Sequence, residues 1–341
     1  MNTGYLVMGR ELKGLEDRVL DHYMFVTRNN SIGVIVGNSH TDFFYIGYIK
    51  YVVTNKDTIW CNNFLCYERV VKIYDPRIVH EYTYWRTYIP YYGSEVPIIP
   101  LHIVKRIYDP KKRALEVLFK CEDNLECMAA SFIEQLYRTG ISQGIGITGS
   151  LLPRIHNPRY SDLDFIIYGT REAINTIEFI EENPSTFHAF PQGRLNEWVR
   201  MNAEMNKIPL EAARKLYRRW RRGVYDGREY SILYNNGIYS SILNKPEWRT
   251  LGKTKIIVEI EPGINGLNYP SIARIGKWIH ISGTAPRGDV SYILSFEALY
   301  IPLFFEGGKA QVEGLLQYSK VLDEYRVLVG VKEYSGRIIP L

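Results

Sequence analysis

The middle of the chain alternates between two hydrophobic periodicities. Residues 123–140 have apolar side chains at the three- and four-residue spacing of a helix, and 163-LDFIIYG-169 is a compact apolar run typical of a buried strand. The apolar positions of this helix are Leu125, Met128, Phe132, Ile133 and Leu136. Further helices are expected at 170–183 and within 194–223, where Pro209 marks the first turn of a second helix, and a strand is expected at 227–235. The alternation predicts a small α/β unit.

Short β-branched and aromatic runs, separated by Gly, Pro and Asn, dominate both flanks of this unit. We therefore predict an α+β multidomain protein. It would have a β-rich N-terminal domain (1–120), a central α/β core (121–244) and a C-terminal small β-barrel of OB-like type (245–341).

Composition supports a folded chain. Apolar residues make up 46% of the 341 positions, enough for two or three packed domains. No run of 18 apolar residues exists, so we expect no membrane span. The N-terminal segment MNTGYLVMGRELKG lacks the pattern of a signal peptide, so we expect a cytoplasmic protein.

Four cysteines occur in two pairs, Cys61 with Cys66 and Cys121 with Cys127. Their spacing differs from the C-x2-C pairs of zinc ribbons. We expect unpaired thiols in a reducing cytosol, with disulfides as the alternative if the source is a hyperthermophile.

The main candidate chemistry is an acid pair at the start of a predicted strand. Asp162 and Asp164 are two residues apart, so their side chains share one face of the strand. Two carboxylates at this distance repel each other, and a divalent cation removes the conflict. Oxygen ligands favour Mg²⁺ or Mn²⁺ over zinc.

Gly149 and Ser150 precede the acid pair by an eleven-residue spacer. This pattern resembles the signature of the nucleotidyltransferases of the DNA polymerase β superfamily: a hydrophobic–Gly–Gly/Ser turn, a spacer, then Asp–hydrophobic–Asp/Glu. The resemblance implies that Asp162 and Asp164 are catalytic and bind the metal. Glycine lets a phosphate approach the backbone, and the Ser150 hydroxyl can bind phosphate oxygens. We expect Arg159 and Ser161, beside the acid pair, to contact the nucleotide.

A third carboxylate usually completes the site in this superfamily. Glu229, in 228-REYSILYN-235, is the preferred candidate because its strand follows the helices in the expected order. Glu259 fits the local pattern better but lies where the C-terminal domain begins. A third possibility is that neither residue serves.

The segment from Arg194 to Arg222 holds the basic excess of the chain. It contains nine basic and three acidic residues, a balance of +6 against +5 for the whole chain. Arg214, Arg218 and Arg222 fall at i, i+4 and i+8 and would form one stripe of a helix, with Arg219 beside it. We expect this stripe to bind triphosphate or nucleic acid. The alternative is a solvated face paired with acids elsewhere.

The whole chain is also similar to an uncharacterised archaeal family of predicted nucleotidyltransferases. The similarity rests on HYMFVTRNNSIGVIVGNSH, YIGYIKY and RRGVYDGREYSI as well as the central signature. The expected activity is transfer of a nucleoside monophosphate from an NTP to a hydroxyl, with RNA as one candidate acceptor, and with release of pyrophosphate. The alternatives are an inactive nucleic-acid-binding protein with the same fold and a nucleotide-sensing module.

Overall fold

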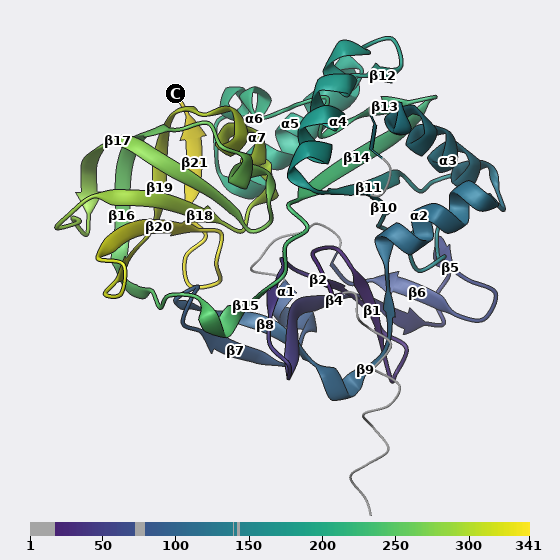
Figure 1. The fold of residues 1–341 in the computed structure, drawn as a ribbon, viewed down its shortest axis with the longest axis horizontal. Helices are drawn as coiled ribbons and strands as arrows, with labels where there is room; N and C mark the ends of the chain where they lie inside the picture. Colours follow the sequence, from purple (N-terminus) through teal and green to yellow (C-terminus); the bar gives the residue numbers. More distant parts are fainter. Residues whose placement is uncertain (1–17, 72–78, 139, 142–143) are drawn as a thin grey trace, which may run out of the picture.

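Three β-structures with associated helices make up the fold in the computed structural model (Figure 1). The structure describes residues 18–71, 79–138, 140–141 and 144–341. The N-terminal segment that argued against a signal peptide lies outside these residues. The mixed α+β class is confirmed.

The N-terminal part is an eight-stranded sheet with the order β5-β6-β4-β2-β1-β9, to which β8 and β7 are joined through β4. Its strands are β1 (Met24–Thr27), β2 (Ile32–Ile35), β4 (Phe44–Thr54), β5 (Trp60–Cys61), β6 (Cys66–Arg69), β7 (Arg86–Ile89), β8 (Ser94–Pro100) and β9 (Val104–Tyr108). The short helices α1 (Val79–Tyr82) and η1 (Leu101–Ile103) lie between strands of this part. Strand β3 (Ser39–His40) pairs with β15 (Ser240–Ser241), which links this part to the second half of the chain.

The central part is a five-stranded sheet with the order β10-β11-β14-β13-β12. Strands β11 and β14 are parallel neighbours, and the other pairings are antiparallel. The elements are α2 (Pro110–Phe119), α3 (Asn124–Tyr137), β10 (Ile145–Ile147), β11 (Leu163–Tyr168), α4 (Thr170–Glu182), β12 (Phe187–His188), α5 (Gln192–Asn206), α6 (Leu210–Lys215), β13 (Arg222–Tyr225) and β14 (Arg228–Asn235).

The C-terminal part is a closed five-stranded barrel. Its strands follow the order β16-β17-β18-β20-β19, and β19 pairs back to β16, while β21 adds to the edge of β19. The elements are η2 (Ile242–Asn244), β16 (Arg249–Ile260), η3 (Ile264–Leu267), β17 (Ser271–Gly283), β18 (Val290–Ser295), η4 (Ala298–Tyr300), α7 (Ile301–Glu306), β19 (Gly308–Ser319), β20 (Glu324–Val329) and β21 (Arg337–Pro340). The small barrel predicted from the strand spacing is therefore confirmed.

The two faces of β11 contact different parts of the molecule. Leu163, Phe165 and Ile167 are buried in one core with α2, α3 and α4. Ile166 and Tyr168, on the other face, are buried against the N-terminal sheet. Successive side chains of a strand point to opposite faces of the sheet. The central sheet is thus covered by helices on one side and by the N-terminal part on the other.

The predicted arginine stripe is wrong. Helix α5 ends at Asn206 and a second helix, α6, begins directly after Pro209, as expected, but α6 runs only from Leu210 to Lys215. Arg218 lies in the turn that follows, and Arg222 begins β13. These arginines do not share a helical stripe because α5 and α6 are tied into the hydrophobic core of the barrel, which ends the helix early.

The expectation of unpaired thiols is also wrong. Cys61 and Cys66 are opposite each other in the β5–β6 hairpin and form a disulfide. Cys121 and Cys127, at the start of α3, form a second one, with their Cα atoms 5.0 Å apart. Both pairs are close in sequence, with separations of 5 and 6 residues.

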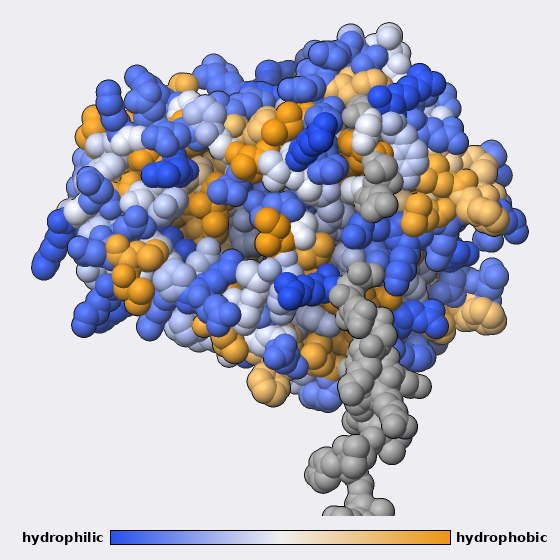
Figure 2. Space-filling view, viewed as in Figure 1, coloured by the Kyte–Doolittle hydropathy of each residue, from blue (hydrophilic) through white to orange (hydrophobic). Residues whose placement is uncertain are grey.

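The exterior gives one further observation. The face seen in Figure 2 is mostly hydrophilic, with hydrophobic side chains in separate patches. Within the described ranges, no helix has the length and apolarity needed to cross a membrane.

Candidate active site

The acid pair lies at the edge of the covered face of the central sheet. Asp162 directly precedes β11, and Asp164 is its second residue. Asp164 shares its face with Ile166 and Tyr168, which contact the N-terminal part. The hydroxyl of Ser231 on β14 donates a hydrogen bond to Asp164. The pair therefore sits where the N-terminal part, β11 and β14 meet.

Gly149 fixes the position of Asp164. Its backbone has φ +63°, and a Cβ atom added there would lie 2.0 Å from the Oδ2 atom of Asp164. The preceding residue, Thr148, donates its N–H to the carbonyl of Asp164 at 2.9 Å. Ser150 is buried. The Gly-Ser turn is thus packed directly against the second aspartate, and only glycine fits the first position.

The spacer is held to the neighbouring strand by backbone contacts. The Ser161 hydroxyl accepts the N–H of Asn157 at 3.0 Å. The guanidinium of Arg228 on β14 donates to the carbonyls of Arg159 and Pro158 at 2.7 and 3.0 Å. Arg159 itself projects an exposed side chain. Ser161 therefore shapes the loop, and Arg228 anchors it next to the acid pair.

Glu229 is the candidate third carboxylate that lies beside the pair. Leu163 pairs with Tyr230 and Asp164 with Ser231, which places Glu229 next to Asp162. Both of its carboxylate oxygens accept hydrogen bonds from Arg194 of α5, at 2.6 and 3.0 Å. Glu259 lies instead on β16 of the barrel, exposed and opposite Lys309.

Electrostatic repulsion is concentrated at Asp162. Desolvation, followed by the charges of Asp164 and Glu229, raises the pKa of Asp162 to about 6, while Arg222 and Arg194 oppose the rise. The residue is exposed to solvent, so water screens much of this repulsion. Asp162 is ionised in most molecules at neutral pH and gains from any added cation.

The four arginines predicted to bind an anion have different roles. Arg218 pairs with Glu306, Arg219 with Glu181, and Arg214 donates to Asn196. Arg222 lies on β13 opposite Ser231 and acts on Asp162. Only Arg222 of the four is linked to the acid pair in the described structure. Sequence reasoning missed Arg194, because nothing local marks its long-range bond to Glu229.

A basic cavity adjoins these arginines. Its volume is about 170 Å³, and its walls include Arg194, Arg218, Arg221 and Arg222 together with Trp198 and Tyr217. Arg194 and Arg222 are thus shared between this cavity and the acid pair. Burial lowers the pKa of Arg221 to about 9, and its guanidinium donates to the carbonyl of Ile232.

One cation of the N-terminal part is also linked to this region. Burial and the nearby Arg69 lower the pKa of Lys50 on β4 to about 8, and the charge of Asp164 opposes this change. No role had been predicted from the sequence for residues 1–120. Lys50 was not found because its link to Asp164 spans more than a hundred residues.

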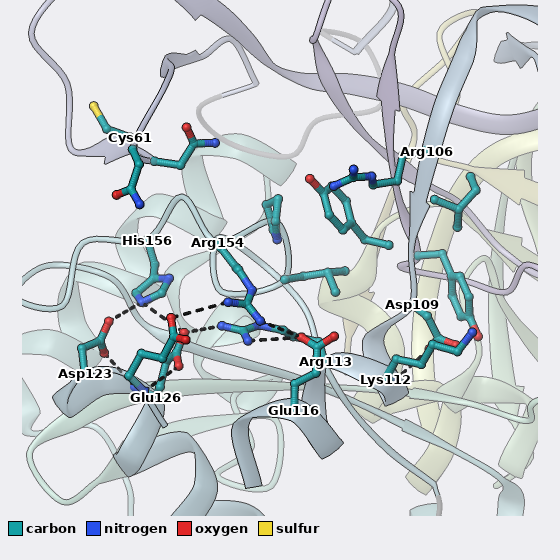
Figure 3. Close-up of a pocket in the computed structure, with 18 of the residues that line it drawn as sticks. Cys61, Arg106, Asp109, Lys112, Arg113, Glu116, Asp123, Glu126, Arg154 and His156 are labelled. Carbon is teal, nitrogen blue, oxygen red and sulfur yellow. Dashed lines mark hydrogen bonds and ion pairs between the residues drawn. The ribbon is translucent and has the colours of Figure 1, made fainter. Parts of the chain in front are cut away.

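A second cluster of possible ligands lies in a larger cavity of about 860 Å³ (Figure 3). Ligand atoms of Asp123, Glu126 and His156 lie within 4.8 Å of one another, so these residues could hold a metal ion. Among the described residues no other triad is this compact. The carboxylates of Asp162, Asp164 and Glu229 are further apart, with Glu229 turned to Arg194.

Internal contacts already neutralise this second cluster. Arg113 is buried and ion-paired to Glu126, as Figure 3 shows, and His156 Nε2 lies 2.8 Å from Asp123. Burial alone would raise the pKa of Asp123, but bonds from the backbone of Glu126, from His156 and from the backbone of Leu125 lower it. A metal ion here would have to compete with Arg113.

Comparisons with family models, with curated proteins and with solved structures gave no match for this chain. The assignment of function therefore rests on the residues and their geometry.

Proposed function

We propose that the chain is a metal-dependent nucleotidyltransferase, which moves a nucleoside monophosphate from an NTP to a hydroxyl acceptor. One observation carries the proposal: Asp162 directly before β11 and Asp164 on it lie beside Glu229, which occupies the adjacent position of the parallel strand β14. The glycine turn that precedes them is packed against Asp164. The central signature and this folded arrangement both support the proposal.

The donor set at the acid pair fits Mg²⁺ or Mn²⁺. It consists of carboxylate oxygens, and the repulsion that raises the pKa of Asp162 would be relieved by a divalent cation. Asp162 and Asp164 would hold the ion. When bound, such an ion neutralises phosphate charge and favours in-line displacement at the α-phosphorus.

The other residues of the chain have distinct tasks in this proposal. Gly149 and Ser150 bind phosphate oxygens through the turn, and Arg222 and Arg194 contact the polyphosphate. Once Arg194 has moved to the phosphates, Glu229 accepts the proton of the acceptor hydroxyl. The acceptor oxygen bonds to the α-phosphorus, the bond from that atom to the bridging oxygen breaks, and pyrophosphate leaves with the electron pair.

An assay of pyrophosphate release tests the proposal. The protein is incubated with each labelled NTP, Mg²⁺ or Mn²⁺, and total tRNA or small hydroxyl acceptors. Release by the wild type, abolished in Asp162→Asn/Asp164→Asn and retained in Asp123→Asn, supports the enzyme. No release from any NTP with any acceptor contradicts it.

A second candidate function is a non-catalytic nucleic-acid-binding protein. Two observations favour it. Both carboxylate oxygens of Glu229 are engaged by Arg194, and the C-terminal part is a closed five-stranded barrel; small barrels of OB type bind oligonucleotides. Salt-sensitive RNA binding without turnover of any NTP would support this alternative.

The cytoplasm is the proposed location, because NTPs and Mg²⁺ are plentiful there. The disulfides Cys61–Cys66 and Cys121–Cys127 are then most consistent with a hyperthermophilic source, whose intracellular proteins are rich in disulfides. This agrees with the similarity to an archaeal family.

A further inference from the structure

The N-terminal part covers the same face of the central sheet that carries the acid pair. Ile166 and Tyr168 of β11 are buried in one cluster with Ile49 of β4, and Val52, Val70 and Leu233 pack against it. Asp164 belongs to the same face, one position beyond this apolar contact. Strand β4 therefore runs past the site that binds the metal in our proposal.

Lys50 lies at an irregularity in β4. Ile32 of β2 pairs with Tyr51 and Gly33 pairs with Ile49, so Lys50 has no partner in this ladder. Ile49 belongs to the cluster that faces the central sheet, whereas Tyr51 belongs to a different one. A bulge of this kind redirects side chains and often lies next to an active site.

The bulge places Lys50 on the strand that runs past the face of Asp164. The side chain of Lys50 is half-buried, and the charge of Asp164 acts on its ammonium group. In the described part of the chain Lys50 makes no ion pair within 4.0 Å, and its Nζ atom lies 5.6 Å from the centre of the Tyr51 ring. Arg69, whose Nε donates to the carbonyl of Val71, adds positive charge nearby.

We propose that Lys50 binds the polyphosphate of the NTP beside Asp164, so that the N-terminal part supplies one wall of the nucleotide site. The proposal rests on the nucleotidyltransferase function proposed above and assigns a role to the β-rich N-terminal part. A half-buried cation without a close ion-pair partner is costly, and a phosphate oxygen would offset that cost. Arg69 adds positive charge near Lys50, and the charges of Arg222 and Arg194 act on Asp162.

The affinity for inorganic tripolyphosphate in the presence of Mg²⁺, measured by titration calorimetry, tests the role of Lys50. This ligand has no nucleobase, so the result does not depend on base preference. We expect Lys50→Met to raise the Kd about tenfold, which equals about 1.4 kcal/mol. Lys50→Arg should keep most of the affinity. The matched control is Lys56→Met, because Lys56 lies just beyond the same strand, exposed and paired with Glu68 at 2.9 Å. Thermal unfolding verifies that each variant is folded.

The outcomes separate the two proposals. Unchanged tripolyphosphate binding in Lys50→Met, or no binding by the wild type, overturns the role of Lys50. If NTPs are turned over with the same KM in Lys50→Met, only the role of Lys50 fails. If tripolyphosphate binding depends on Lys50 but no NTP is turned over with any acceptor, the polyphosphate site stands and the nucleotidyltransferase proposal fails.

Discussion

Two groups of potential metal ligands in this chain differ in how their charges are balanced. In the first, Asp162 lies beside Asp164 and Glu229, and its pKa is raised to about 6. In the second, Asp123 lies beside Glu126 and His156, and its pKa is lowered. The second group is the more compact, yet it has an internal cation, Arg113, bound to Glu126.

The difference shows that proximity of ligand atoms is a weak criterion for a metal site. A carboxylate that is already paired gains little from an added cation, whereas one with a raised pKa gains more. We therefore interpret the Asp123 group as structural and the Asp162 group as functional. The predictions below separate the two interpretations.

The largest effect is expected from Asp164→Asn. The substitution keeps the shape of the side chain but removes the charge needed to hold the cation. We expect nucleotidyl transfer to fall about a thousandfold or more, equal to about 4 kcal/mol of barrier. Steady-state pyrophosphate release measures the effect. Asp123→Asn is the control, and a comparable loss there would reverse the functional interpretation of the two groups.

Arg113→Met should cause the largest loss of stability. Arg113 is buried, and its removal leaves the buried carboxylate of Glu126 without its cation. The expected cost is about 3–5 kcal/mol in the free energy of unfolding. Urea unfolding measures it. Arg154→Met, which removes an exposed cation paired with Glu116 and Glu122, should cost less than about 1 kcal/mol. Equal costs would show that the second cluster is not held by its internal ion pair.

Gly149→Ala should perturb the first site through shape alone. The new methyl group would meet the Asp164 carboxylate, and the residue has a left-handed backbone, so a loss of about 1–3 kcal/mol in stability is expected together with weaker Mn²⁺ binding. Gly193→Ala is a suitable control, because this glycine lies in α5 and a Cβ atom added there would meet no other atom within 4 Å. That variant should be neutral or stabilising. A harmless Gly149→Ala would contradict the close packing of turn and carboxylate.

The smallest expected effects are changes in stability at neutral pH, and they should have opposite signs for Asp162→Asn and Asp123→Asn. Ionisation of Asp162 is disfavoured by folding, so its cost is absent below pH 4, grows up to about pH 6 and persists above it. Asp162→Asn should therefore stabilise the protein at pH 7, by about 1 kcal/mol after allowance for screening, and not at pH 4.

Asp123→Asn should show the reverse dependence on pH. The lowered pKa of Asp123 contributes stability above its unfolded pKa, near 4, which is lost as pH falls further. The variant should be less stable than the wild type at pH 7, and the difference should shrink in acid. Thermal unfolding between pH 3.5 and 8 measures both variants. Effects of the same sign would refute the contrast between the groups.

Local pattern predicted the central elements well. The apolar spacing from Leu125 to Leu136 predicted a helix that the structure places at Asn124–Tyr137, and 163-LDFIIYG-169 is β11. Both are determined by periodicity within a short segment. The closed C-terminal barrel followed from short strands separated by turns. These features are determined by residues that are close to one another in the sequence, so the sequence alone is enough to predict them.

Long-range contacts could not be predicted in the same way. Three interactions at the candidate site join distant segments. They are the bond between Arg194 and Glu229, the ion pair of Arg218 with Glu306, and the influence of the Asp164 charge on Lys50. The predicted arginine stripe failed because composition favoured a helix that tertiary packing ends at Lys215. The assignment of Glu229 over Glu259 stays a prediction, although the structure places only Glu229 beside Asp162.

Binding of Mn²⁺, measured by titration calorimetry, tests the central claim most directly. The account predicts that the wild type and Asp123→Asn/Glu126→Gln bind Mn²⁺, and that Asp162→Asn/Asp164→Asn does not. Binding that survives in Asp162→Asn/Asp164→Asn but is lost in Asp123→Asn/Glu126→Gln would place the metal site in the other cluster and contradict the account.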